Sequence, residues 1–196
     1  MNKKYSVITG GTGYVGLALV KYLTGRGENV RLLLLEDHPC LDGIDCEKVY
    51  GNICNPEDLD AAFENAETVY HIAGVVDISG KKEKLMWNVN VGGTKNVVES
   101  CKKMGVKNLI YVSSIDTYPD KFCEGVISER SEYSEVGLDS PYAITKALAT
   151  QIVLDAKDDI KVCCVQPTGV IGPDDYMAPA SAQRWICLSR VCSRYP

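Results

Sequence analysis

Three evenly spaced glycines follow the first apolar run of the chain and limit what it can fold into. The run ends at Ile8, and a Gly-x-x-Gly-x-x-Gly segment follows directly. Such a segment lets a strand turn sharply into a helix, whose free N–H groups and positive dipole end can face a pyrophosphate. The segment therefore predicts a dinucleotide-binding loop that contains Gly10, Gly13, Tyr14, Val15 and Gly16.

Strand-like and helix-like segments alternate along most of the sequence. We predict strands over residues 4–9, 29–35, 46–50, 67–72, 107–113 and 160–166. We predict helices over 14–26, 82–104 and 140–157, and a short helix that opens at Pro56. A long connection over 114–139 is of a length that is usually functional or mobile. This alternation predicts an α/β fold, a doubly wound parallel sheet of the Rossmann type.

Charge and cysteine content argue against several kinds of partner. The formal net charge of −5 disfavours a surface for nucleic acid or anionic lipid. Nine cysteines occur without a Cys-x-x-Cys pair and with only two histidines, so no metal site is predicted. No apolar run approaches the ~20 residues of a membrane span, so we expect a cytoplasmic protein with no membrane partner.

The composition changes abruptly after Asp175. Residues 176–196 contain three arginines but neither a lysine nor an acidic residue, so all 26 acidic residues precede them. A basic amphipathic helix would explain this segment, and so would a frame-shifted or vector-derived tail. We predict a dinucleotide-binding domain over 1–175, an atypical basic tail over 176–196 and a truncated C-terminal substrate region.

A tyrosine and a lysine four residues apart lie at the start of the predicted helix 140–157. On a helix Tyr142 and Lys146 share a face, near the sheet edge at which open α/β proteins bind ligands. Ser113 and Ser114 end the strand before this helix. A cation about 4 Å from a phenol would bring its pKa down from ~10 toward neutrality. These side chains are therefore candidates for acid–base chemistry.

The glycine loop, the strand-end serines and the Tyr-x-x-x-Lys pair, in this order, resemble the extended short-chain dehydrogenase/reductase family, within the NAD-dependent epimerase/dehydratase superfamily. The similarity runs from about residue 4 to 175. It includes His71-Ile72-Ala73-Gly74, Asn90-Val91-Gly92-Gly93-Thr94 and a Pro-Thr-Gly segment that begins at Pro167. The residues after Ala73 and after Ser113 look most like the dihydroflavonol-reductase and 3β-hydroxysteroid-dehydrogenase branch.

The resemblance implies roles for individual residues. Tyr142 would be the catalytic acid/base, Lys146 would hold the nicotinamide ribose and lower the Tyr142 pKa, and Ser114 would donate a hydrogen bond to the reacting oxygen. The cofactor-binding residues would be Gly10, Gly13, Tyr14, Val15, Gly16, Asn52, Ile53, Ala73, Asn90, Tyr142, Lys146 and Pro167. Asn90 either contacts the cofactor or pins its helix to the sheet. His71 is predicted to pack at a strand end rather than act as a base.

The cofactor is expected to be NAD or NADP, and the residues after the second strand favour NAD. Leucines stand where an aspartate would hold the ribose or an arginine would meet a 2′-phosphate, and Glu36 and Asp37 would repel a phosphate there. Asn52 stands where an aspartate normally meets the adenine amine, and its amide oxygen can accept the same bond.

The expected function is the interconversion of a secondary alcohol and a ketone by hydride transfer on a small-molecule substrate. A nucleotide-sugar epimerase or dehydratase that holds NAD tightly would use the same residues, and a non-catalytic nucleotide-binding fragment is a third reading. A further alternative is that the chain forms a homodimer through apolar surface that the truncation uncovers.

Overall fold

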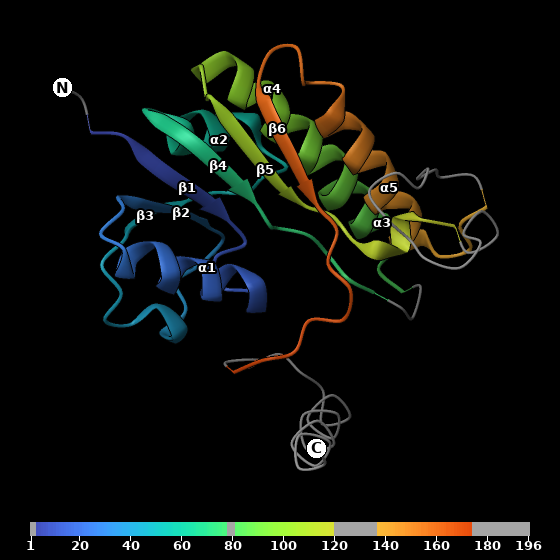
Figure 1. Ribbon diagram of the computed structural model, residues 1–196, viewed down its shortest axis with the longest axis horizontal. Helices are drawn as coiled ribbons and strands as arrows, with labels where there is room; N and C mark the ends of the chain where they lie inside the picture. The colour runs from blue at the N-terminus through green and yellow to red at the C-terminus, as the bar shows by residue number, and fades with distance from the viewer. Residues whose placement is uncertain (1–2, 78–80, 120–136, 174–196) are drawn as a thin grey trace, which may run out of the picture.

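Six strands form one parallel sheet in the computed structural model, which describes residues 3–77, 81–119 and 137–173. The strands are β1 (Tyr5–Thr9), β2 (Val30–Leu34), β3 (Glu47–Tyr50), β4 (Ala66–His71), β5 (Asn108–Val112) and β6 (Lys161–Val165). Their spatial order is β3-β2-β1-β4-β5-β6, the Rossmann order (Figure 1). The predicted fold class and all six predicted strands are confirmed, and each strand end lies within one residue of its prediction.

The helices are α1 (Tyr14–Gly25), α2 (Pro56–Phe63), α3 (Glu83–Met86), α4 (Thr94–Met104) and α5 (Pro141–Leu154). The helix predicted over 82–104 is divided, because a π-helical turn at Trp87–Gly93 separates α3 from α4. Helix α5 ends three residues before its predicted end, because tight turns such as that from Leu154 to Lys157 lead the chain toward β6. No helix within the described ranges is long and apolar enough to cross a membrane.

Alternating side chains of the strands build two cores, one on each face of the sheet. Val7 and Leu33 point to the face that α2, α4 and α5 cover, whereas Ile8 and Leu32 point to the face that α1 covers. The core beneath α1 ends at β4. On the same face of β5 and β6 no helix of the described part of the chain lies over the strands (Figure 1). Side chains of β4, β5 and β6 line a hollow of about 400 Å³. The predicted tail 176–196 lies outside the described residues.

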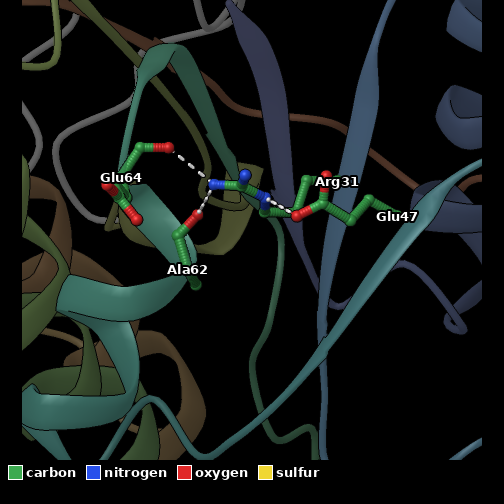
Figure 2. Close-up of polar contacts among 4 residues, drawn as sticks. All are labelled: Arg31, Glu47, Ala62 and Glu64. Carbon is green, nitrogen blue, oxygen red and sulfur yellow. Dashed lines mark hydrogen bonds and ion pairs between the residues drawn. The ribbon is translucent and has the colours of Figure 1, made fainter. Parts of the chain in front are cut away.

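A buried arginine joins the first three strands to the end of α2. Arg31 Nε donates to Glu47 Oε1 at 2.7 Å, and Nη1 donates to the carbonyl oxygens of Ala62 at 2.9 Å and Glu64 at 2.6 Å (Figure 2). The guanidinium also lies 3.9 Å from the centroid of the Tyr5 ring. Burial raises the Glu47 pKa, but hydrogen bonds from Tyr5 and Arg31 outweigh it and leave that pKa below its ordinary value. Arg31 thus satisfies carbonyl groups at a helix end that water cannot reach freely.

We expect Arg31→Met to lower the free energy of unfolding by about 2–4 kcal/mol, because it leaves the Ala62 and Glu64 carbonyl oxygens without their donor. Urea denaturation followed by circular dichroism measures the change. Arg26→Met is the matched control, since Arg26 is exposed and its side chain contacts the neighbouring Tyr22. Equal stability of the two variants would show that the Arg31 contacts do not hold α2.

Candidate active site

The turn between β1 and α1 brings backbone against backbone. A Cβ atom on Gly16 would lie 2.0 Å from the Gly10 carbonyl oxygen, and a Cβ on Gly10 would lie 2.6 Å from the Ala73 nitrogen. Gly10 also has a φ of +77°, which favours glycine. A Cβ on Gly13 would meet nothing closer than the Gly10 oxygen at 3.4 Å. Folding therefore requires glycine at positions 10 and 16 but not at 13.

Gly13 is exposed and caps α1 from an extended conformation. The N–H groups of the first helical turn, which includes Tyr14 and Val15, have no partner within the helix, and this turn carries no acidic residue. A phosphate can therefore approach the helix N-terminus over Gly13 without meeting a side chain or a negative charge. The fold does not require glycine at position 13, and the missing side chain leaves room for a ligand.

Tyr14 connects this turn to the segment that follows β6. A Cβ on Gly172 would lie 2.7 Å from the Tyr14 hydroxyl, so the phenol lies directly against this segment. Pro167, in the same segment, accepts a hydrogen bond from the Ile115 nitrogen at 3.0 Å. The segment after β6 thus contacts both the glycine turn and the turn that carries Ser114.

Asn90, in the π-helical turn, pins the segment after β4. Its Oδ1 accepts from the Val75 nitrogen at 2.8 Å, and its Nδ2 donates to the Val75 carbonyl oxygen at 3.0 Å and to Thr145 Oγ1 at 3.2 Å. Both amide protons are therefore used within the protein. The Asn90 side chain thus joins the segment after β4 to α5, and a contact with the cofactor stays a prediction.

His71 lies at the centre of a buried hydrogen-bond chain. Its Nδ1 lies 2.8 Å from Thr9 Oγ1, and its Nε2 lies 2.9 Å from Thr94 Oγ1. Thr94 donates its own proton to the Asn90 carbonyl oxygen, so Nε2 must carry the hydrogen and Nδ1 must accept from Thr9. Burial lowers the His71 pKa to about 3, and the ring is neutral. This arrangement agrees with a packing role and leaves no path for His71 to act as a base.

The two serines after β5 have different surroundings. Ser113 is buried, and its Oγ lies 2.6 Å from Thr150 Oγ1. Thr150 donates to the Lys146 carbonyl oxygen, so the Ser113 proton must be given to Thr150. Ser114 Oγ accepts from the Asp116 nitrogen at 3.2 Å, and the Ser114 hydroxyl makes a hydrogen bond with Tyr142 that lowers the Tyr142 pKa. This difference favours Ser114 as the group that meets a reacting oxygen.

Lys146 is 5% exposed and lies beneath the segment after β4. Its Nζ donates to the Val112 carbonyl oxygen at 2.6 Å and lies 4.5 Å from the centroid of the Tyr111 ring. A Cβ on Gly74 would lie 3.9 Å from Nζ, so glycine at this position leaves access to the ammonium group. Burial lowers the Lys146 pKa to about 8.

The pKa of Tyr142 moves in the direction opposite to our expectation. Burial raises it above the ordinary value, the hydrogen bond with Ser114 lowers it in part, and the Asp116 charge raises it further. Lys146 does not appear among these influences, because its ammonium group is directed at Val112 and Tyr111. The prediction that Lys146 lowers the Tyr142 pKa is wrong for this arrangement, and the phenol is protonated near neutral pH.

The ends of β2 and β3 complete the same edge of the sheet. Leu35 is 75% exposed after β2, and the Asp37 carboxylate bonds Lys48 Nζ at 2.8 Å, which lowers the Asp37 pKa. Asn52 Oδ1 accepts from the Cys54 nitrogen at 2.9 Å and retains one lone pair for a ligand. Ile53 is buried against Gly93 of the π-helical turn, so its side chain belongs to the core.

The predicted site residues therefore gather at the carboxyl ends of the parallel strands, where α/β proteins of this kind bind ligands. Sequence reasoning missed Thr9, Gly74, Thr94, Tyr111 and Thr145, which support them. Thr94 ends the segment that begins at Asn90, and Tyr111 lies two residues before Ser113. Only their burial reveals a role for them.

The fold and the glycine-rich turn define a Rossmann chain of the extended short-chain dehydrogenase/reductase class. The sequence matches the 3-beta hydroxysteroid dehydrogenase/isomerase family over residues 7–192, and the chain belongs to this family.

Curated relatives and a solved structure agree with this assignment. The chain is 34% identical over 184 residues to the decarboxylating sterol-4-alpha-carboxylate 3-dehydrogenase of Mus musculus, covering 88% of this chain and 47% of that protein. It is 30% identical over 185 residues to the 2-alkyl-3-oxoalkanoate reductase of Stenotrophomonas maltophilia, and the match covers 91% of this chain and 54% of that protein. The structure of a short-chain dehydrogenase/reductase superfamily protein from Agrobacterium tumefaciens, crystallised with bound NAD, matches this chain with a TM-score of 0.73 and 25% identity. That match covers 83% of this chain and 48% of the other. The chain spans about half the length of these proteins.

We expect acid to destabilise the protein through His71. The unfolded chain protonates His71 below a pKa of about 6.5 and the folded chain only near 3, so the free energy of unfolding falls as the pH drops between these values. The loss should be about 2 kcal/mol between pH 7.5 and pH 5. His71→Gln, which does not titrate, should show a shallower decline in urea denaturation across the same pH range. Parallel pH curves for the two proteins would contradict this account.

Proposed function

We propose that this chain is an NAD(P)-dependent oxidoreductase that interconverts a secondary alcohol and a ketone on a small-molecule substrate. The observation that carries the proposal is the group at the end of β5, where the Tyr142 hydroxyl bonds Ser114 beside the buried Lys146. The relatives support the same class, because their names describe a 3-dehydrogenase and a 3-oxo reductase.

The residues of the chain fit a dinucleotide. The open position at Gly13 and the uncapped first turn of α1 suit its pyrophosphate, and Lys146 Nζ under Gly74 suits the nicotinamide ribose. Lys146 has three N–H groups, and Val112 takes one of them, so two remain for ribose oxygens. The bound nicotinamide would accept or supply the hydride.

Tyr142 and Ser114 would handle the proton and the substrate oxygen. In the reduction direction Tyr142 is ready as the acid, because its raised pKa keeps the hydroxyl protonated near neutral pH. The Ser114 hydroxyl, which bonds Tyr142 in the unliganded chain, would donate its proton to the substrate oxygen and hold it in reach of Tyr142. In the oxidation direction Tyr142 must first lose its proton, so the oxidation of an alcohol should require higher pH than the reduction of a ketone.

NAD is the preferred cofactor in this proposal. The end of β2 carries the carboxylates of Glu36 and Asp37, which repel a 2′-phosphate, although Lys48 offsets part of the charge on Asp37. Arg31, the arginine of β2, is buried among α2 carbonyl groups and cannot turn toward a cofactor (Figure 2).

We expect Gly13→Val to abolish NAD binding in calorimetry while the folded domain persists, because the side chain enters the space for the pyrophosphate and not the core. Gly25→Val is the control, since Gly25 lies at the other end of α1 and a Cβ there meets nothing within 4 Å. Calorimetry of the parent with NAD and NADP tests the preference. Unchanged NAD affinity in Gly13→Val would remove the glycine turn from the cofactor site.

We expect Tyr142→Phe to reduce hydride transfer by roughly 10²-fold or more while cofactor affinity changes little, and Lys146→Ala to damage both. Nicotinamide absorbance with a 3-oxo acid and with a neutral ketone as substrates measures turnover, and calorimetry measures affinity. Tyr50→Phe is the control, because Tyr50 is exposed at the end of β3. Near-parental turnover in Tyr142→Phe would refute the mechanism.

The epimerase alternative predicts a different result. An epimerase returns the hydride within one cycle, so cofactor would co-purify with the protein and no net reduced nicotinamide would accumulate. Ketone-dependent loss of nicotinamide absorbance at 340 nm would instead support the oxidoreductase.

A further inference from the structure

The catalytic candidate Lys146 lies over an aromatic ring that its proposed chemistry does not use. The Lys146 Nζ lies 4.5 Å from the centroid of the Tyr111 ring, and Tyr111 is 1% exposed within β5. The His71 ring stacks on Tyr111 with centroids 5.4 Å apart and planes 29° apart. Neutral His71 can stay close to this ammonium group, whereas a protonated ring would be repelled.

We propose that Tyr111 is a positioning residue for Lys146, and that its ring face holds the Nζ ammonium group in place beneath Gly74. This inference rests on the proposed role of Lys146 in binding the nicotinamide ribose. The side chain of Lys146 has lost nearly all its water, and the Val112 carbonyl satisfies one N–H group only. An aromatic face within about 6 Å attracts a cation, and more strongly where water is excluded.

The hydroxyl of Tyr111 does not explain why the residue is there. It meets no hydrogen-bond partner of normal geometry among the described residues. The Thr94 hydroxyl, which it faces, already gives its proton to the Asn90 carbonyl oxygen and accepts from His71. The ring, and not the hydroxyl, is therefore the part of Tyr111 that acts on Lys146.

Within the part of the chain that the structure describes, the titratable groups around Lys146 supply no compensating charge near neutral pH. The titratable groups that act on it or lie against it are His71 from β4, Tyr111 from β5 and Cys164 from β6, and Tyr142 lies one turn before it on α5. His71 is neutral, burial raises the Cys164 pKa to about 12, and both phenols keep their protons. The ring face and the Val112 carbonyl are left to stabilise the ammonium form.

The test measures the pKa of Lys146 directly. NMR of the whole chain with isotopically labelled lysine, with the Lys146 signal assigned from Lys146→Arg, gives the pKa without cofactor or substrate. Tyr111→Phe should leave this pKa unchanged, since it keeps the ring face. Tyr111→Leu, which keeps an apolar side chain but has no such face, should lower it by about one pH unit. Equal Lys146 pKa values in the Phe and Leu variants would overturn the proposal.

A second series keeps the test decisive if Tyr111→Leu does not fold. Progressive fluorination of the ring in Tyr111→Phe weakens the negative face with little change in shape. The Lys146 pKa should fall stepwise with each fluorine, and a constant pKa would overturn the proposal. Because this readout needs no turnover, a chain that shows the pKa series but transfers no hydride would contradict the proposed function and leave the role of Tyr111 intact.

Discussion

The contact of backbone with backbone at the β1–α1 turn is the constraint on which the site depends. Gly16 lies against the Gly10 carbonyl oxygen, and Gly10 lies against the nitrogen of Ala73. Neither partner is a flexible side chain, so neither can move aside for a Cβ atom. These contacts fix the start of α1 relative to the end of β4. They leave Gly13 open toward solvent, where a phosphate can meet the helix N-terminus.

A buried polar chain extends this constraint to the candidate catalytic residues. It runs from Thr9 through His71 and Thr94 to Asn90, and from Asn90 to Thr145 on α5. Thr145 lies between Tyr142 and Lys146, and its hydroxyl donates to the Tyr142 carbonyl oxygen. Each proton in the chain has one acceptor, so the arrangement has a single satisfied pattern. The glycine turn and helix α5 are thereby held in one geometry although more than 120 residues separate them in sequence.

The two halves of the sheet differ in how far the described helices cover their faces. Both faces of β1 and β2 are covered, whereas the face of β5 and β6 opposite α5 borders an open hollow. The chain spans about half the length of its curated relatives. In the proposed function, the residues described above would form the cofactor side of the site, and Ser114, Tyr142 and the segment after β6 would meet the substrate.

The sequence by itself determined the strands, because buried parallel strands are short apolar runs with clear ends. It also determined the glycine turn and the shared helix face of Tyr142 and Lys146, because both depend only on local spacing. Only the tertiary structure decided the rest. Three features depend on partners far along the chain: the π-helical turn at Asn90, the choice of the His71 nitrogen that carries the hydrogen, and the aromatic ring beneath Lys146. The direction of the Tyr142 pKa was predicted wrongly for the same reason, since a charge four residues away is visible in sequence but burial is not. Desolvation depends on everything that packs around a group, and only the folded chain brings those groups together.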